Sequence, residues 1–189
     1  RNLRLIRGFA ANDFGGAVLV QPGAHLAVTV SLIANSRAGQ TGGAIAVFPG
    51  ASLEIDGATL QANRARDGGA IASSGPTTIS NAEFLDNSAE VDQGGALQVW
   101  TTTLVMTNVT LDRNQGRQGG ALLQRGGTSQ LTDVQFRDNV AQHEGGGFHL
   151  YENGVAELLR VQFTGNTAVS RGGGLFVAHG DALEFPDLG

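Results

Sequence analysis

The sequence contains no cysteine and no lysine, and only four of its 189 residues are proline. Without cysteine, disulfide bonds and thiolate metal sites are excluded. All twelve basic residues are arginines, and with seventeen acidic residues the net charge is -5. Because acids and bases are mixed along the chain, we expect no basic face for nucleic acid. No apolar run reaches the length of a membrane span, so we expect no membrane-spanning segment in this sequence.

Glycine is abundant, with 29 residues spread evenly along the chain. Glycine pairs are spaced by 27, 26, 26, 25, 26 and 27 residues, and they begin at Gly15, Gly42, Gly68, Gly94, Gly119, Gly145 and Gly172. A second motif, FxxN or LxxN, recurs between the pairs and begins at Phe9, Leu32, Leu60, Phe84, Leu111, Phe136 and Phe163. Self-similarity at a fixed period of this length indicates a solenoid.

Each repeat holds three short runs in which apolar residues alternate with polar ones, as in Gly42–Val47 or Leu53–Ile55. These runs are too short for helices and have the period of β-strands. Short strands of this kind must bury their apolar side against the next repeat. We therefore predict a right-handed, single-stranded parallel β-helix of about seven coils of 25–27 residues with three sheets. We expect one domain over residues 1–189, as a piece of a longer protein, because strand pattern begins at the first residues.

The coil alignment predicts two kinds of column. The residue six positions before each motif asparagine is expected to adopt a left-handed turn. From the third repeat on, these residues are Gly57, Asn81, Asn108, Asp133 and Arg160. Arg160 alone is not a typical turn residue. We therefore expect the last turn to differ. Charges alternate in two further columns, Asp86, Arg113, Asp138 and Arg66, Asp92, Arg117. Alternation avoids like charges in contact, which supports the alignment.

The motif asparagines predict an internal ladder in which each amide bonds to its copy in the next coil. Its predicted members are Asn35, Asn63, Asn87, Asn114, Asn139 and Asn166. The alternative is an asparagine that merely suits a turn. Neither interpretation gives asparagine a catalytic role.

The pairing of GGA(I/L/V) with FxxN resembles the repeats of chlamydial polymorphic membrane proteins and similar bacterial surface proteins of pectate-lyase-like β-helix fold. The best matches are Phe84–Asn87 with Gly94–Leu97, and Leu60–Asn63 with Gly68–Ile71. The resemblance covers nearly the whole chain, and it implies an adhesin passenger at a bacterial surface. The last two repeats depart from the pattern because they read Gly-Gly-Gly.

Catalysis is not expected on the strands that follow the glycine pairs. If Ile45 and Val47 point inward, the outward columns are Ala17, Ala44, Ala70, Ala96, Ala121, Gly147, Gly174 and Leu19, Ala46, Ala72, Gln98, Leu123, His149, Phe176. Neither contains a carboxylate for acid–base chemistry or Ca²⁺. Glu54 and Glu157 share a column but lie four coils apart. The four histidines fall in different columns, so no metal site is expected, and His143 beside Glu144 is interpreted as a solvated pair.

One further outward column is Gln21, Phe48, Ser74, Trp100, Arg125, Tyr151 and Ala178. Its consecutive Trp100, Arg125 and Tyr151 would allow the guanidinium to lie between two rings. We take these three residues, with Gln98 and His149 beside them, as the candidate binding patch for a sugar or a partner protein. The alternative is that the column stacks only for stability.

These observations favour a non-enzymatic extracellular or cell-surface scaffold, adhesive or structural, that binds a glycan or a host protein along its flank and needs no cofactor. Two alternatives remain. One is a polysaccharide lyase or hydrolase whose catalytic residues lie outside this segment. The other is a solenoid that self-associates end to end through unpaired strand edges.

Overall fold

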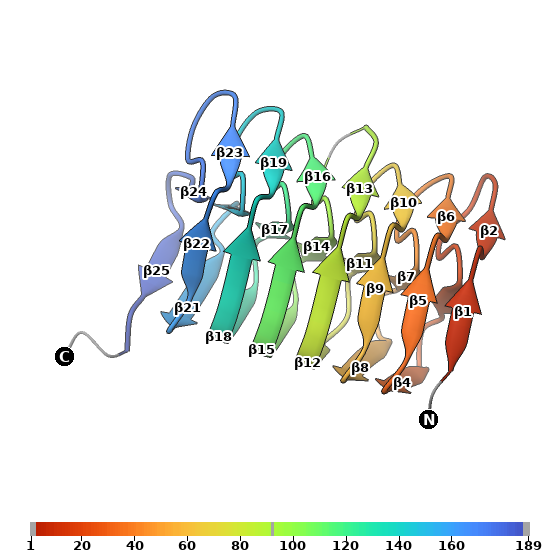
Figure 1. Cartoon of the computed structure of the whole chain (residues 1–189). Coiled ribbons are helices and arrows are strands. Elements are labelled where there is room, and N and C mark those ends of the chain that lie inside the picture. Colours follow the sequence, from red (N-terminus) through yellow and green to blue (C-terminus); the bar gives the residue numbers. More distant parts are fainter. Residues whose placement is uncertain (1–2, 92, 187–189) are drawn as a thin grey trace.

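A computed structural model of the chain describes residues 3–91 and 93–186. In these ranges every regular element is a β-strand, and the chain winds into seven coils that stack along one axis (Figure 1). All strand pairs are parallel, and they assemble into three sheets, which confirms the predicted β-helix. The described residues contain no helix of a length and apolarity that would cross a membrane.

Two of the sheets have seven strands each. The strands that follow the glycine pairs, named here the Gly-Gly sheet, are β3 (Val18–Val20), β7 (Ile45–Val47), β11 (Ile71–Ser73), β14 (Leu97–Trp100), β17 (Leu122–Arg125), β20 (Phe148–Tyr151) and β24 (Leu175–Val177). The two-residue strands of the short sheet are β2 (Phe9–Ala10), β6 (Arg37–Ala38), β10 (Arg64–Ala65), β13 (Ser88–Ala89), β16 (Gln115–Gly116), β19 (Val140–Ala141) and β23 (Thr167–Ala168).

The third or long sheet has eleven strands because three of the coils contribute two strands each (Figure 1). They are β1 (Arg4–Ile6), β4 (His25–Thr29), β5 (Leu32–Ala34), β8 (Ser52–Asp56), β9 (Thr59–Gln61), β12 (Thr77–Leu85), β15 (Thr103–Asp112), β18 (Thr128–Arg137), β21 (Val155–Leu159), β22 (Gln162–Thr164) and β25 (Ala182–Glu184). In the three middle coils the two strands merge into one long strand, β12, β15 or β18.

The apolar core runs the length of the solenoid as stacked columns. In the Gly-Gly sheet, Ile45 pairs with Ile71, which pairs with Leu97, and all three are fully buried. Phe136 and Phe163 stack in the neighbouring column with ring centroids 4.8 Å apart. The inward direction expected for Ile45 and Val47 is therefore confirmed.

The glycine pair is required where the chain enters the Gly-Gly sheet. Gly42 has φ of +68°, and a Cβ there would lie 2.2 Å from the Ile45 carbonyl oxygen. At the next residue, Gly43, a Cβ would clash with the following coil, because it would lie 2.1 Å from the Gly69 oxygen. Both positions exclude any side chain, and the repeat therefore follows from coil-to-coil backbone packing.

The column of residues after each pair was assigned to the wrong side. Ala44, Ala70, Ala96 and Ala121 are completely buried and belong to the apolar core. The N–H groups of Ala44 and Ile45 both donate to the Ala70 carbonyl, so the alternation of sides is broken here and both residues face inward. Small residues occupy this column, and at Gly147 even a Cβ would meet the Phe163 ring at 2.9 Å.

The predicted turn column adopts left-handed backbone throughout, with φ between 50° and 70° at Gly57, Asn81, Asn108, Asp133 and Arg160. The expectation that Arg160 departs was wrong. Arg160 takes φ of 53°, and its guanidinium donates to both carboxylate oxygens of Asp133 at 2.7 and 2.8 Å. Arginine alone does not favour a left-handed turn, and here the turn occurs together with an ion pair between neighbouring coils.

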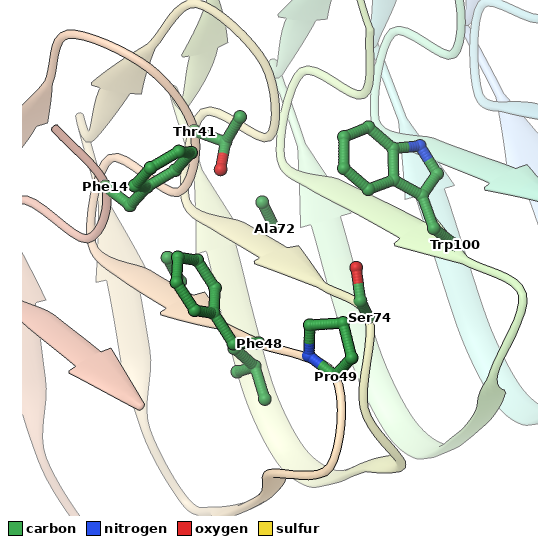
Figure 2. A pocket seen from close by; sticks show the side chains of 9 residues that line it. Phe14, Thr41, Phe48, Pro49, Ala72, Ser74 and Trp100 are labelled. Atoms are coloured by element: carbon green, nitrogen blue, oxygen red, sulfur yellow. The ribbon is translucent and has the colours of Figure 1, made fainter. Parts of the chain in front are cut away.

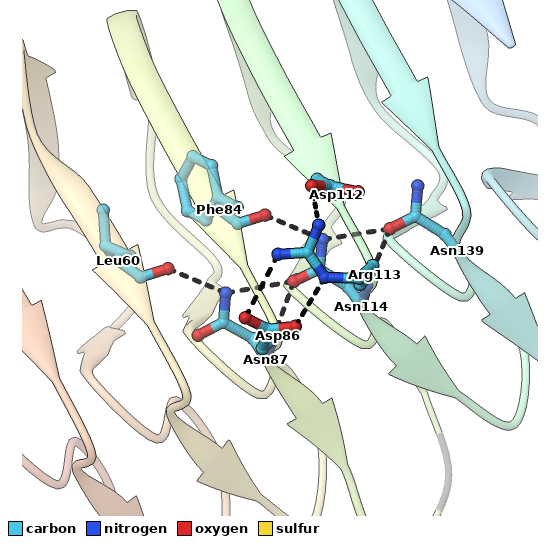
Figure 3. A network of polar contacts seen from close by, with 8 residues as sticks. All are labelled: Leu60, Phe84, Asp86, Asn87, Asp112, Arg113, Asn114 and Asn139. Carbon is cyan, nitrogen blue, oxygen red and sulfur yellow. Dashed lines mark hydrogen bonds and ion pairs between the residues drawn. The ribbon is translucent and has the colours of Figure 1, made fainter. Parts of the chain in front are cut away.

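Five asparagines stack as a hydrogen-bonded ladder: Asn63, Asn87, Asn114, Asn139 and Asn166. In each step the backbone N–H and Nδ2 donate to Oδ1 of the next asparagine. Nδ2 of Asn87 also donates to the Leu60 carbonyl at 2.9 Å, as Figure 3 shows. These buried amides satisfy one another and the turn backbone, so they leave no group for a ligand.

The ladder prediction was wrong at Asn35. The backbone N–H of Ser36, not of Asn35, donates to Asn63 Oδ1 at 3.0 Å, because Ile33 pairs with Leu60. Asn35 lies one position earlier, exposed and at φ of 55°. The first coil is misaligned as well, since Phe9 lies in β2 with 69% of its surface exposed. The apparent FxxN motifs at Phe9 and Leu32 are therefore coincidental.

The charge column stacks as its alternation predicted. Arg113 donates from Nε to Asp86 Oδ1 at 2.9 Å, and it also contacts Asp112 (Figure 3). These contacts raise the pKa of Arg113, first through the hydrogen bond to Asp86 and then through the Asp112 charge. In the second predicted column, Asp92 lies outside the described residues.

Candidate ligand-binding site

The outer face of the Gly-Gly sheet carries the predicted binding patch. In β14, Leu97 and Val99 are buried in the core, and the side chains of Gln98 and Trp100 leave the sheet on the other side. The register places Trp100, Arg125 and Tyr151 next to one another in consecutive coils. The outer face therefore carries two columns of side chains, one that contains Gln98 and one that contains Trp100.

The Gln98 column is covered, contrary to prediction. Gln98 is 1% exposed and His149 is 3% exposed. The loops that precede the glycine pairs fold back over this column, and their residues form bridges from coil to coil, such as Glu144 with Arg171. One of these loop residues, Gln93, accepts a hydrogen bond from Gln98 Nε2 at 3.0 Å. Gln98 and His149 are therefore internal supports of the face.

Arg125 does not lie between two rings. Its Nε donates to Glu152 at 2.7 Å, and its guanidinium carbon lies 6.0 Å from the centre of the Tyr151 ring. Among the described residues, Tyr151 is the one ring that it approaches in this way. The hydrogen bond to Glu152, followed by the nearby Tyr151, raises the pKa of Arg125. Arg125 is thus already engaged by residues of the next coil.

Tyr151 divides the face into two parts. Its hydroxyl donates to Gln93 Oε1 at 3.2 Å, so the side chain reaches from the sixth coil back to the fourth. Because Gln98 donates to the same oxygen, Gln93 joins the three residues into one bridge. We name Gln93, Gln98 and Tyr151 the Tyr151 bridge. The predicted patch is therefore interrupted, with one hollow on either side of it.

The first hollow, named here the aromatic slot, has a volume of about 380 Å³. It is lined by Phe14, Thr41, Ala46, Val47, Phe48, Pro49, Ala72, Ser74 and Trp100. Phe14 and Phe48 meet edge to face, with centroids 5.1 Å apart, on one side of Ala72, and Trp100 lies on the other (Figure 2). The slot is therefore bordered by three aromatic rings over a floor of small side chains.

The polar groups of the aromatic slot are few. Figure 2 shows the hydroxyl oxygens of Thr41 and Ser74 facing the space between the rings. Trp100 turns the six-membered part of its indole toward that space, and its Nε1 is buried on the far side without an acceptor among the described residues. No lining residue carries a charge.

Sequence reasoning missed the slot, although part of its signal was present. The outward column contains Phe48, Ser74 and Trp100 in consecutive coils, so that a small residue separates two aromatic ones. That pattern predicts a gap between rings. Phe14 and Thr41, in contrast, lie in loops before the glycine pairs, and the alternation within strands carries no information on where such loops fold.

The second hollow, named here the His149 hollow, has a volume of about 520 Å³. Its lining includes five titratable side chains, Glu144, His149, Tyr151, Arg171 and His179. Glu144 forms an ion pair with Arg171 and only 12% of its side chain is exposed, so the expected solvated pair with His143 was wrong. The guanidinium of Arg171 lies 5.0 Å from the centre of the Phe176 ring.

His149 is the most buried titratable group of this hollow. Its ring lies near the rings of Tyr151 and Phe176, at centroid distances of 5.2 and 4.9 Å. Burial lowers the pKa of His149, because desolvation penalises the imidazolium, while the Glu144 and Asp181 carboxylates act in the opposite direction. No group of three metal-binding side chains gathers anywhere in the described ranges.

Comparison with known proteins agrees with this architecture. A family model described as the right handed beta helix region matches residues 11–186. The chain belongs to this right-handed β-helix family. Membership leaves the activity of a right-handed β-helix open, because the family includes pectate-lyase-like enzymes and non-enzymes. Searches of curated proteins and of solved structures found no match.

Proposed function

We propose that this right-handed β-helix is a non-enzymatic extracellular or cell-surface scaffold, and that it binds an uncharged glycan in the aromatic slot. The observation that carries the proposal is the slot itself, an apolar hollow bordered by Phe14, Phe48 and Trp100. Its volume of about 380 Å³ lies within the range of roughly 300–1,000 Å³ typical of small-molecule sites.

A sugar ring matches the chemistry of the slot. The C–H faces of a pyranose are apolar and pack on aromatic rings, while its hydroxyls require hydrogen-bond partners. Thr41 and Ser74 offer such partners, since both hydroxyls face the slot (Figure 2). An apolar side chain of a partner protein would use the rings but not the hydroxyls, and for that reason we favour a glycan.

The surface location rests on the resemblance of the glycine-pair and FxxN repeats to bacterial surface proteins. A scaffold role fits the stacked core and the asparagine ladder, which keep the outer face rigid along several coils. A rigid site loses little conformational entropy when it binds.

Polysaccharide cleavage is the second candidate function. It is favoured by the enzymes in the family and by the titratable groups of the His149 hollow. Incubation with neutral and acidic polysaccharides, followed by measurement of new chain ends, tests it. Cleavage that is lost in His149→Gln would establish the enzyme and overturn the non-enzymatic scaffold.

Binding is tested by an array of glycans and host proteins. We expect Trp100→Ala to weaken glycan binding by about 2 kcal/mol, as for an aromatic hot spot. Ser74→Tyr, which fills the slot from an outward position, should abolish it. Arg125→Ala is the matched control, since Arg125 occupies the same column and lies outside the slot.

Two outcomes of the array would contradict the proposal. Glycan binding that is unchanged in Ser74→Tyr, with all variants folded by thermal melting, would place the ligand elsewhere. Binding to proteins alone, and sensitive to Ser74→Tyr, would replace the sugar by a partner's apolar side chain.

A further inference from the structure

We infer that the aromatic slot takes a single uncharged sugar unit at the end of a glycan, rather than an internal or an acidic unit. This inference rests on the proposed function and narrows its ligand. It follows from three properties of the slot: its lack of charge, its closure along the solenoid axis and its volume.

The lack of charge excludes acidic sugars. The nine lining residues are all uncharged. A carboxylate in this hollow would lose its hydration without gaining a cationic partner, and the burial of an unpaired charge is strongly unfavourable. Arg125, in the adjoining coil, lies outside the lining and its Nε is bound to Glu152 at 2.7 Å.

Closure along the axis excludes a chain that runs along the solenoid through the slot. On one side, Phe14 packs edge to face on Phe48 across the first two coils. On the other side, beyond Trp100, the Tyr151 bridge spans from the fourth to the sixth coil. The slot therefore extends over roughly 10 Å of the axis, the distance of two coil spacings between Phe48 and Trp100.

The volume of the slot is that of a small ligand site. At about 380 Å³ the slot lies near the lower end of the range for ligand sites, roughly 300–1,000 Å³. The rest of the glycan must leave the slot sideways or outward, away from the sheet. A terminal unit needs one such exit and an internal unit needs two, so this geometry favours a chain end.

An array with two matched series tests this inference. One series presents immobilised neutral oligosaccharides with a free terminal hexose, and the other presents the same oligosaccharides capped with a terminal uronic acid. Wild type should bind the first series and should bind its capped partners at least about 30-fold more weakly, the factor expected for loss of a hot-spot contact. Ser74→Tyr should bind neither series.

Tyr151→Ala supplies the gain-of-function arm, because it removes the barrier beyond Trp100 without changing the lining of the slot. We expect this variant to bind internal neutral units, measured with cyclic glucans that have no chain end, whereas wild type does not. Binding of the capped series or of cyclic glucans by wild type, abolished by Ser74→Tyr, would overturn the inference and leave the proposed function intact. Absence of any slot-dependent glycan binding would overturn both.

Discussion

Phe48 and Trp100 occupy the same outward column of the Gly-Gly sheet two coils apart, and both border the aromatic slot. Ser74, in the coil between them, is small enough to leave the space open. A solenoid brings such residues together by stacking alone, because positions separated by one repeat become neighbours. The site is therefore a property of several stacked coils rather than of any one loop.

Core substitutions that remove volume and those that add volume should both lower the stability of the protein. Leu97→Ala should lower the free energy of unfolding by about 2–5 kcal/mol, since stacked coils cannot collapse around the cavity. Ala96→Leu should also destabilise, by about 1–3 kcal/mol, because Ala96 faces the filled core. Urea denaturation measures both, with exposed Thr107→Ala as the control. An Ala96→Leu variant as stable as wild type would show that this column faces solvent.

The asparagine ladder predicts a difference between Asn87 and Asn35. Asn87→Ala removes the acceptor of the Asn63 backbone N–H and side-chain amide. Each buried donor left unsatisfied costs about 1–3 kcal/mol. Asn35→Gly keeps the left-handed turn and removes an exposed side chain, so its effect should stay within about 0.5 kcal/mol. Equal losses in urea melts would contradict the one-residue shift.

The fold was predictable because it is periodic. Parallel, in-register stacking converts a fixed repeat into contacts, and the Ile45–Ile71–Leu97 column could therefore be assigned from spacing alone. The failures have local causes. Ser36 replaces asparagine in the ladder, which shifted the motif by one residue. Alternation within a strand also predicts to which side of the sheet a side chain points, but not whether a loop covers it. The burial of Gln98 and His149 beneath loops could therefore not be foreseen.

The charge column predicts a salt-dependent loss of stability. Arg113→Asp would place an acid between Asp86 and Asp138 and would remove the hydrogen bond to Asp86. Exposed ion pairs contribute little to stability, and salt screens them. We expect a small destabilisation at low salt that shrinks as salt is raised, measured by thermal melts. A loss that does not change with salt would indicate strain in the turn rather than charge.

His149 predicts an acid-sensitive stability. Because burial lowers its pKa below the ordinary value of 6.5, the unfolded chain binds more protons at this position than the folded protein does. The stabilisation is complete above pH 6.5 and is lost as the pH falls below it. Glu144 and Asp181 moderate the effect, and Arg171 strengthens it.

We expect His149→Leu to remove this part of the pH dependence when unfolding free energies are measured between pH 8 and pH 5. His143→Ala changes an exposed histidine of the neighbouring loop and serves as the control. An unchanged pH profile in His149→Leu would show that His149 is not buried in its neutral form.

The fluorescence of Trp100 tests the central claim most directly, because it is the single tryptophan of the chain and borders the aromatic slot. Titration of wild type with the neutral oligosaccharide that gives the strongest array signal should shift the emission to shorter wavelength and protect the indole from acrylamide. Ser74→Tyr should show neither change. Binding detected by calorimetry, with Trp100 emission and quenching unaltered throughout the titration, would contradict a glycan site in the slot.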